Sequence, residues 1–223
     1  MTLPMSWTGR DVDRAIRVGL GCGLAAALMY LAWSFLPLPP RVNTLAHAFF
    51  GLLLVPGFLA IGLRVQDARA SVAALFGTLF GIIAGPFFAA MTIVQVSNLA
   101  YLNRFIRESG DEAARERYGE ILRGVFTVQL GLDVVWDLFV TSATILIGFA
   151  MLQVPGARRA LGLLGIAAGG LTLGLNLWTM PVPPAEAGLF DAGPAVGTWY
   201  LVVVSWMLWF PGSGVAAPAP RGD

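Results

Sequence analysis

The sequence predicts an all-α protein, built as a polytopic transmembrane helix bundle with six spans. Of its 223 residues, 57% are hydrophobic and only 12% are charged, whereas a typical soluble domain has about 25% charged residues. A soluble chain of this length would need many more polar residues to cover its surface. The apolar residues also occur in long blocks, which short charged or Pro-rich segments separate. We therefore expect lipid to surround the outer surface of the protein.

Six apolar blocks are predicted to be transmembrane helices, because about 20 residues of helix cross the hydrocarbon core of a bilayer. The expected spans cover residues 15–36, 44–63, 70–97, 124–152, 160–179 and 195–210, within a single domain over 1–212. Three arginines precede the first block, as in a signal peptide. This block is longer than the apolar region of a signal peptide and lacks a small-residue cleavage site. We expect it to remain in the protein as the first span.

A charged segment over about 107–123 separates the third and fourth blocks. Asp111 and Arg115 lie four positions apart, and Glu112 and Arg115 three apart, so these opposite charges meet on one face of a helix. The segment is predicted to be a solvated helix outside the bilayer; the alternative is a helix that docks a partner or gates a pathway. Residues 213–223 are rich in Pro, Gly and Ala and are expected to be a disordered tail.

The arginines predict an orientation, because cytoplasmic loops carry an excess of basic residues. With six spans and a cytoplasmic N-terminus, the outer side receives Arg41 and the arginines between the third and fourth spans. The larger inner set is Arg10, Arg14, Arg17, Arg64, Arg69, Arg158, Arg159 and Arg221. Both termini are therefore expected in the cytoplasm. All 14 basic residues are Arg, which is typical of a GC-rich genome, so we expect a multi-pass protein of the bacterial inner membrane.

Small residues recur at every fourth position along three of the expected spans. They are Gly19, Gly23 and Ala27 in the first, Ala73, Gly77, Gly81, Gly85 and Ala89 in the third, and two pairs in the fifth, Gly165 with Gly169 and Gly170 with Gly174. Such stripes let helix backbones approach closely in a membrane. We expect them to pack the helices of one chain together; the alternative is the interface of a homo-oligomer.

Two acids, Asp133 and Asp137, lie within the apolar fourth block. A charged residue at the centre of a bilayer costs about 2.5–3.5 kcal/mol on insertion scales, so such residues generally face a bundle interior or an aqueous cavity. Gln129 lies one helical turn before the acids and Thr141 one turn after them, so the four positions form a polar stripe. Because four residues overshoot one turn by about 40°, this stripe winds slowly around the helix.

Polar residues on other spans are the expected partners of the two acids. The binding candidates are Gln95 and Asn98 in the third span, Asn176 in the fifth, His47 in the second, and Gln129, Trp136 and Thr141 in the fourth. A low-dielectric medium disfavours two neighbouring negative charges, so one acid is expected to be protonated at neutral pH. Asp133 and Asp137 are the candidate catalytic or proton-carrying residues; alternatively, their hydrogen bonds only hold the bundle together.

Three further polar residues have a simpler interpretation. His47 lies near a span end and is expected to be an interfacial residue with a satisfied hydrogen bond. Glu186 and Asp191, in the loop before the last span, are expected to be solvated acids, with the mouth of a pocket as the alternative.

The composition excludes several chemistries. The absence of Lys excludes a lysine Schiff base to a cofactor or substrate. One Cys and one His cannot form a standard structural zinc site, and no P-loop or dinucleotide fingerprint occurs. We therefore expect no metal and no cofactor. The net charge of +1 gives no reason to expect nucleic-acid binding.

Arg158 and Arg159, followed by a Gly-rich span, resemble the corresponding part of small six-span bacterial membrane proteins of the domain-of-unknown-function type. This resemblance implies no particular activity. The Asp133-x-x-x-Asp137 spacing resembles one acidic motif of the intramembrane prenyltransferases and part of the CDP-alcohol phosphotransferase motif. The former family needs a second Asp-rich motif that is absent, and Gln129 occupies the Gly position of the latter, so both are excluded.

Two functions remain open. One is a non-enzymatic membrane protein, transporter-like or accessory, with a polar site at the two acids. The alternative is an intramembrane enzyme that acts on a lipid or isoprenoid in the style of the membrane-bound terpene cyclases. A protonated Asp133 or Asp137 would then be the general acid, and Trp136 would line an apolar pocket. In both cases the expected partners are the lipid bilayer and a lipophilic small molecule.

Overall fold

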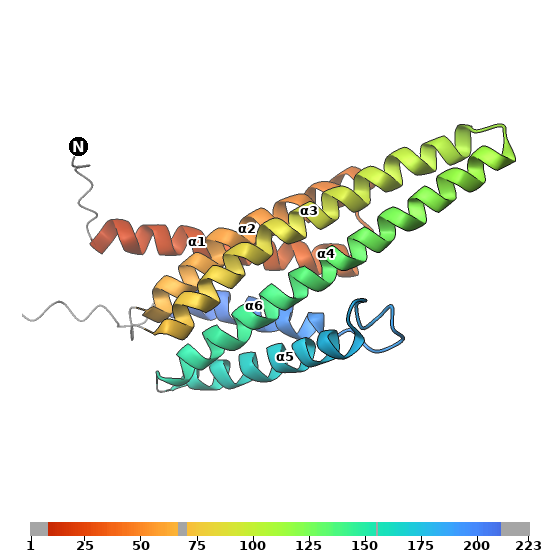
Figure 1. Cartoon of the computed structure of the whole chain (residues 1–223). Coiled ribbons are helices and arrows are strands. Elements are labelled where there is room, and N and C mark those ends of the chain that lie inside the picture. Colours follow the sequence, from red (N-terminus) through yellow and green to blue (C-terminus); the bar gives the residue numbers. More distant parts are fainter. Residues whose placement is uncertain (1–8, 67–70, 155, 211–223) are drawn as a thin grey trace, which may run out of the picture.

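The computed structural model describes residues 9–66, 71–154 and 156–210. These residues form six α-helices and no strand (Figure 1), which confirms the all-helical prediction. The helices are α1 (Gly9–Phe35), α2 (Pro40–Gln66), α3 (Val72–Glu108), α4 (Glu112–Leu152), α5 (Ala157–Thr179) and α6 (Gly193–Trp209). The predicted tail at 213–223 and the expected start of the third span at Ala70 lie outside the described residues.

Five of the helices, α1 to α5, are long and apolar enough to cross a membrane. The sixth helix, α6, is also apolar but has 17 residues. Its length is therefore about 26 Å, slightly less than the hydrocarbon core of a typical bilayer. Pro194 lies in its first turn, where a backbone N–H would have no partner within the helix. The Asp191 carboxylate accepts a hydrogen bond from the Gly193 N–H at 2.7 Å, so the start of α6 is well defined.

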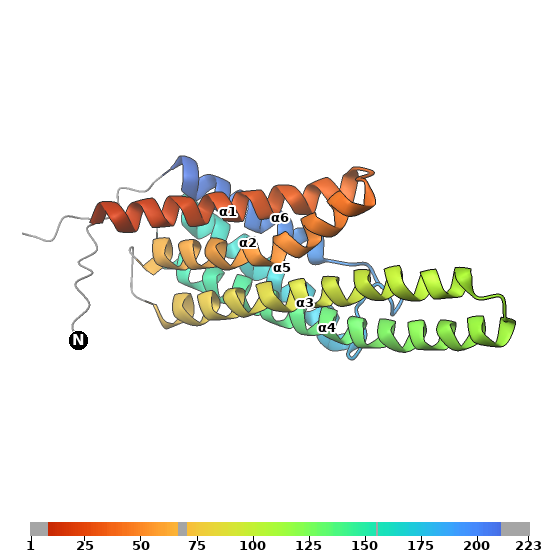
Figure 2. The same ribbon diagram turned by 90° about the horizontal axis from the view of Figure 1, so that it is seen from above.

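The six helices form a closed ring in the order of the chain. Consecutive helices run antiparallel and pack on each other, and α6 returns to pack against α1 (Figures 1 and 2). Helices α2, α4 and α6 also contact one another across the middle. We call the end of the bundle where α1 begins and α6 finishes the terminal end, and the opposite end, where α5 finishes and α6 begins, the loop end (Figure 2).

Glycines allow close packing between α1, α2, α3 and α6. The Tyr200 hydroxyl of α6 lies so near Gly23 of α1 and Gly57 of α2 that a Cβ atom at either glycine would collide with it. A Cβ atom at Gly81 of α3 would collide with the ring of Phe58 in the same way. The small-residue stripes of the first and third spans therefore pack the helices of one chain together, as expected.

The small residues of α5 lie on two sides of that helix. A Cβ atom at Gly165 would lie 2.7 Å from the Trp199 ring of α6, and one at Gly169 would lie 2.9 Å from a backbone oxygen of α4. In contrast, Gly170 and Gly174 have nothing within 4 Å of an added Cβ atom. Only part of this stripe is therefore used for packing within the chain.

Helices α3 and α4 extend beyond the rest of the bundle at the loop end, where they form a long antiparallel hairpin (Figure 2). They have 37 and 41 residues, which corresponds to lengths of about 56 and 62 Å. The charged segment predicted as one helix over 107–123 is instead the tip of this hairpin. The prediction of a single helix was wrong because residues 109–111 break it, and the Asp111 side chain caps α4 by accepting a hydrogen bond from the Ala113 N–H at 3.1 Å.

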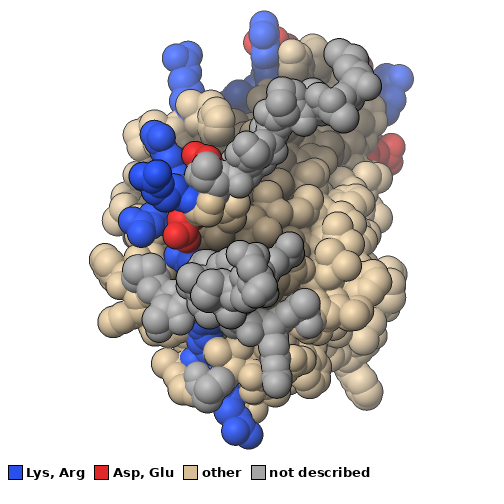
Figure 3. Space-filling model, turned by 90° about the vertical axis from the view of Figure 1, so that its left-hand side faces the viewer, with Lys and Arg blue, Asp and Glu red and all other residues tan. Residues whose placement is uncertain are grey.

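Arginines gather at the terminal end (Figure 3). They include Arg10, Arg14 and Arg17 at the start of α1 and Arg158 and Arg159 at the start of α5. Arg64, near the end of α2, differs from these because it is buried, with 5% of its surface exposed. Its guanidinium lies 3.1 Å from the Asp13 carboxylate of α1, and this ion pair joins the first two helices at the terminal end.

Candidate functional site

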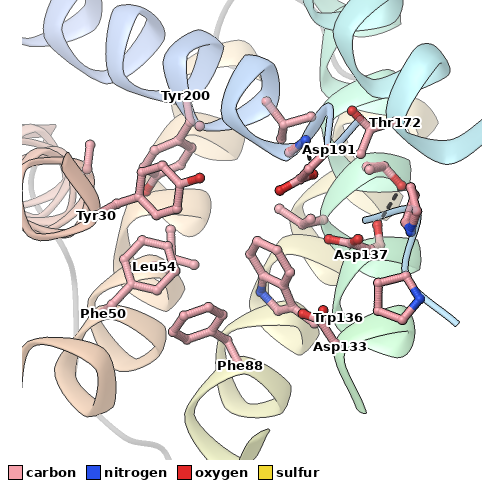
Figure 4. A pocket seen from close by; sticks show the side chains of 18 of the residues that line it. Tyr30, Phe50, Leu54, Phe88, Asp133, Trp136, Asp137, Thr172, Asp191 and Tyr200 are labelled. Carbon is pink, nitrogen blue, oxygen red and sulfur yellow. Dashed lines mark hydrogen bonds between the residues drawn. The ribbon is translucent and has the colours of Figure 1, made fainter. Parts of the chain in front are cut away.

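A cavity of about 220 Å³ lies between the helices. Every helix contributes to its lining, as does the segment between α5 and α6. The polar lining residues are Tyr30, Asp133, Asp137, Thr141, Thr172, Asp191 and Tyr200, and the larger apolar ones are Phe50, Leu54, Phe58, Phe88, Trp136, Val140 and Val196. Figure 4 shows a division between two walls: Tyr30, Phe50 and Leu54 on one side, and the three aspartates on the other.

Helix α4 brings both predicted acids to this cavity. Their four-residue spacing places Asp133 and Asp137 on one helix face, and both line the cavity. Asp137 is 8% exposed, whereas Asp133, one turn nearer the loop end, is half-buried. No Lys or Arg occurs in the lining, and no ion pair to either carboxyl is found within the described part of the chain.

Asn176 of α5 is the polar neighbour of Asp137. It is 1% exposed, and its amide group lies close enough to the Asp137 carboxyl to interact with it. The amide nitrogen also donates to the Thr172 carbonyl oxygen at 3.0 Å, while the amide oxygen is buried and has no partner among the described residues. Asn176 is therefore a neutral neighbour of Asp137, and any negative charge on this carboxyl has no counter-ion among the described residues.

Two threonines complete the polar wall, and both use their hydroxyl hydrogens within the protein. The Thr141 hydroxyl donates to the backbone oxygen of Asp137 at 2.6 Å. The Thr172 hydroxyl lies 2.9 Å from the Ala168 oxygen of its own helix and 3.2 Å from the Ala192 oxygen before α6. Because their hydrogens are occupied, the hydroxyls present oxygen lone pairs to a ligand, so this wall consists mainly of acceptors.

Aromatic rings line much of the remaining cavity surface. The ring centroids of Trp136 and Phe88 are 5.1 Å apart, those of Phe88 and Phe50 are 4.5 Å apart, and both pairs meet edge to face. The Tyr30 ring follows at 6.0 Å from Phe50. These contacts link α1, α2, α3 and α4 in one row of rings, and edge-to-face geometry is favourable for aromatic pairs.

The segment between α5 and α6 borders the cavity at the loop end. Pro183, Pro184, Ala185 and Asp191 belong to the lining. Asp191 is exposed and its position is set by its hydrogen bond to the start of α6. It therefore lies at the mouth of the cavity, which was the alternative interpretation of this residue from the sequence.

Five of the predicted binding residues, Asn176 among them, lie outside the cavity lining, whereas Trp136 and Thr141 belong to it. Gln95, Asn98 and Gln129 meet one another at a small gap between α3 and α4. Gln129 lies two turns before Asp137, so the slow winding of the polar stripe turns it toward α3. The Nδ1 atom of His47 lies 2.8 Å from the Asn43 carbonyl oxygen, and its ring stacks at 6.5 Å on Phe88, which itself lines the cavity.

The sequence alone did not identify the apolar wall. Tyr30, Phe50 and Phe88 are aromatic residues inside apolar blocks, and neither composition nor periodicity distinguishes such a residue in a cavity wall from one that faces lipid. Thr172 and Tyr200 were missed for the same reason. The one signal for a cavity in the sequence was the pair of acids in the fourth block, because acids within a span face the bundle interior or an aqueous cavity.

No protein-family model, curated protein or solved structure matches this chain. Within the described residues, no group of three or more His, Cys, Asp or Glu side chains lies close enough together to hold a metal ion. The three aspartates of the cavity therefore do not form a metal cluster. The arrangement is suited to a molecule with an apolar body and a polar or positively charged group.

Proposed function

We propose that this protein binds a lipophilic small molecule in the cavity and acts as a transporter-like or accessory membrane protein. The observation that carries the proposal is the position of Asp133 and Asp137, which belong to an apolar helix yet line an internal cavity without a counter-ion. An unpaired buried carboxyl disfavours folding. A role in ligand binding would explain why the chain has these two acids despite their cost to folding.

We further propose six spans, with both termini in the cytoplasm of a bacterial cell. Helix α6 supports a sixth crossing, because it runs antiparallel to α5 and alongside α1 (Figure 2). The arginines at the terminal end support the cytoplasmic location of that end. In this orientation the loop end, with Asp191 at the mouth of the cavity, faces the outside.

Photochemical cross-linking tests ligand binding in the cavity. The purified full-length protein is labelled with an amphipathic alcohol that carries a diazirine, and the modified peptides are identified by mass spectrometry. We expect labelling of peptides that contain Trp136 and Tyr200, which line the cavity. Val140→Phe should reduce this labelling at least fivefold, because the larger side chain enters the cavity.

Val128→Phe is the matched control, since Val128 lies on the same helix but is 62% exposed on its outer face. This variant should be labelled like the unmodified protein. Thermal unfolding of both variants shows whether they fold, because overpacking at Val140 should cost about 1–3 kcal/mol. Equal labelling of the two variants at the cavity peptides, or labelling confined to outward-facing residues, would contradict the proposal.

A second candidate function is acid-catalysed chemistry on a lipid or isoprenoid. The feature that favours it is the row of aromatic rings beside the two acids (Figure 4), because aromatic faces stabilise a carbocation. Lipid extracts of cells with and without the protein should then differ by mass spectrometry. Asp133→Asn/Asp137→Asn should remove the new product, and an unchanged lipid profile counts against an enzyme.

A further inference from the structure

We infer that the ligand of the cavity is a small organic cation, an alkylammonium ion whose charge lies against Asp133 and Asp137 and whose apolar groups lie against the aromatic wall. This inference rests on the proposed function and adds the chemical class of the ligand. It depends on three features of the cavity, namely its uncompensated charge, its aromatic lining and its size.

The charge of the cavity is one-sided. Three aspartates line it, and no basic side chain does. Two arginines of the terminal end have contacts of their own: Arg64 pairs with Asp13, and Arg158 lies 5.5 Å from the centre of the Trp206 ring. A buried carboxyl is paired with an opposite charge, binds a metal or stays protonated, and no metal cluster is formed by the described residues. A cationic ligand supplies the missing charge, whereas an anionic ligand would be repelled.

The acids become progressively more buried from the mouth inward. Asp191 is exposed, Asp133 is half-buried and Asp137 is buried. Asp191 and Glu186 both lie close enough to Asp133 to act on it electrostatically. A cation that enters at the loop end therefore meets negative charge along the whole path, and such clefts raise the local concentration of oppositely charged ligands.

The aromatic lining favours a cation whose surface is apolar. Trp136, Phe88, Phe50 and Tyr30 form the row of rings described above. Figure 4 shows Trp136 beside Asp133, and Tyr30 and Phe50 on the side of the cavity opposite the aspartates. The face of an aromatic ring attracts ammonium ions, and quaternary ammonium groups are commonly bound in this way. A strongly hydrated inorganic ion would not gain from such a wall, so an organic cation fits the lining better.

The remaining polar groups of the lining are neutral hydroxyl groups and the indole N–H of Trp136. Tyr200 is 4% exposed, lines the cavity, and has a hydroxyl with no partner in the described part of the chain. The threonine hydroxyls use their hydrogens within the protein. The volume of about 220 Å³ is below the roughly 300–1,000 Å³ of pockets for drug-sized ligands, so the cation is small.

Isothermal titration calorimetry on the full-length protein in an uncharged detergent tests this inference. The test ligand is choline, a small quaternary ammonium ion, and its neutral isostere is 3,3-dimethylbutan-1-ol, in which carbon replaces nitrogen. We expect choline to bind at least tenfold more tightly than the isostere. Asp133→Asn/Asp137→Asn should weaken choline binding at least tenfold, while Glu116→Gln/Glu120→Gln, which also removes two carboxylates but from the exposed hairpin, should leave it unchanged.

A second pair of variants separates the aromatic contribution from folding. Trp136→Leu keeps an apolar side chain and should weaken binding of choline severalfold without weakening that of the isostere. Trp136→Phe keeps an aromatic face and should retain most of the preference for choline. Thermal unfolding checks that each variant is folded.

The outcomes distinguish the inference from the proposed function. If choline and its isostere bind equally, or if neither binds while the cavity peptides are still cross-linked, the cationic class is wrong and the proposal of a ligand cavity stands. If Val140→Phe leaves the cavity cross-linking unchanged, the proposed function fails and the inference fails with it. Tight choline binding that survives Asp133→Asn/Asp137→Asn also overturns the inference.

Discussion

Tyr200 shows how single residues set the packing of this bundle. Its ring lies 5.0 Å from that of Phe58, and its hydroxyl occupies the space that side chains at Gly23 and Gly57 would fill. The hydroxyl has no partner in the described structure, so it contributes volume and no hydrogen bond. The close approach of α1, α2 and α6 therefore depends on the absence of side chains at the two glycines.

This packing predicts different effects for two Gly→Ala substitutions. Gly57→Ala should lower the free energy of unfolding by about 1–3 kcal/mol, because the added methyl group collides with the Tyr200 hydroxyl. Gly170→Ala, at an open position, should be neutral or stabilising by up to about 1 kcal/mol. Denaturation in detergent measures both. Adding Tyr200→Phe should partly restore Gly57→Ala, and equal effects of the two alanines would contradict this account.

The hairpin of α3 and α4 is the element that differs most from a simple transmembrane span. At its tip the Arg104 and Glu108 side chains meet at 2.9 Å, and the rings of Phe105 and Tyr118 stack across the two helices at 5.5 Å. The Arg115 side chain also donates to the Ser109 carbonyl oxygen at 2.8 Å. The ring stack and the Arg115 hydrogen bond therefore join the two sides of the hairpin, whereas the Arg104–Glu108 pair lies within α3.

The cap at Asp111 gives a test at this scale. Asp111→Ala removes the side chain that accepts the Ala113 N–H, and the loss of an N-cap costs about 0.5–2 kcal/mol. Hydrogen exchange of the first turn of α4 should therefore become roughly 2–30 times faster, since about 1.4 kcal/mol corresponds to a factor of ten. Asp111→Asn keeps an acceptor and should exchange nearly as slowly as the unmodified protein. Faster exchange throughout α4 would show that the cap is not a local contact.

The cavity belongs to the whole molecule, because all six helices and the segment before α6 line it. Ring closure between α6 and α1 brings Tyr30 and Tyr200 to the same space as the acids of α4. The start of α1 and the end of α6 therefore lie at the same end of the bundle (Figure 1). The proposed topology and the proposed site therefore depend on the same arrangement of α6.

Cysteine labelling in whole cells tests the topology. In a Cys22→Ser background, Ala113→Cys at the hairpin tip should react with a membrane-impermeant maleimide added outside. Gln153→Cys, in the connection between α4 and α5, should react only after permeabilisation. Gly170→Cys, in the middle of α5, serves as the control and should react in neither case. Labelling of Ala113→Cys and Gln153→Cys from the same side would exclude the proposed crossings.

Some features of this protein follow from the sequence because they depend on neighbouring residues only. The helical class, the five long apolar helices and the shared face of Asp133 and Asp137 all arise from composition and from a period of 3.6 residues per turn. The single charged helix was expected wrongly because its break at Ser109–Asp111 depends on a capping contact that periodicity does not reveal.

The cavity itself was decided by tertiary structure. Gln129 and Asp137 are two turns apart on one polar stripe. Nevertheless, Gln129 lines the small gap between α3 and α4, whereas Asp137 lines the cavity. Tyr30 and Asp191 join the site from opposite ends of the chain. Hydropathy determines that a helix is apolar, but close packing between distant segments determines which of its faces meets lipid and which meets another helix.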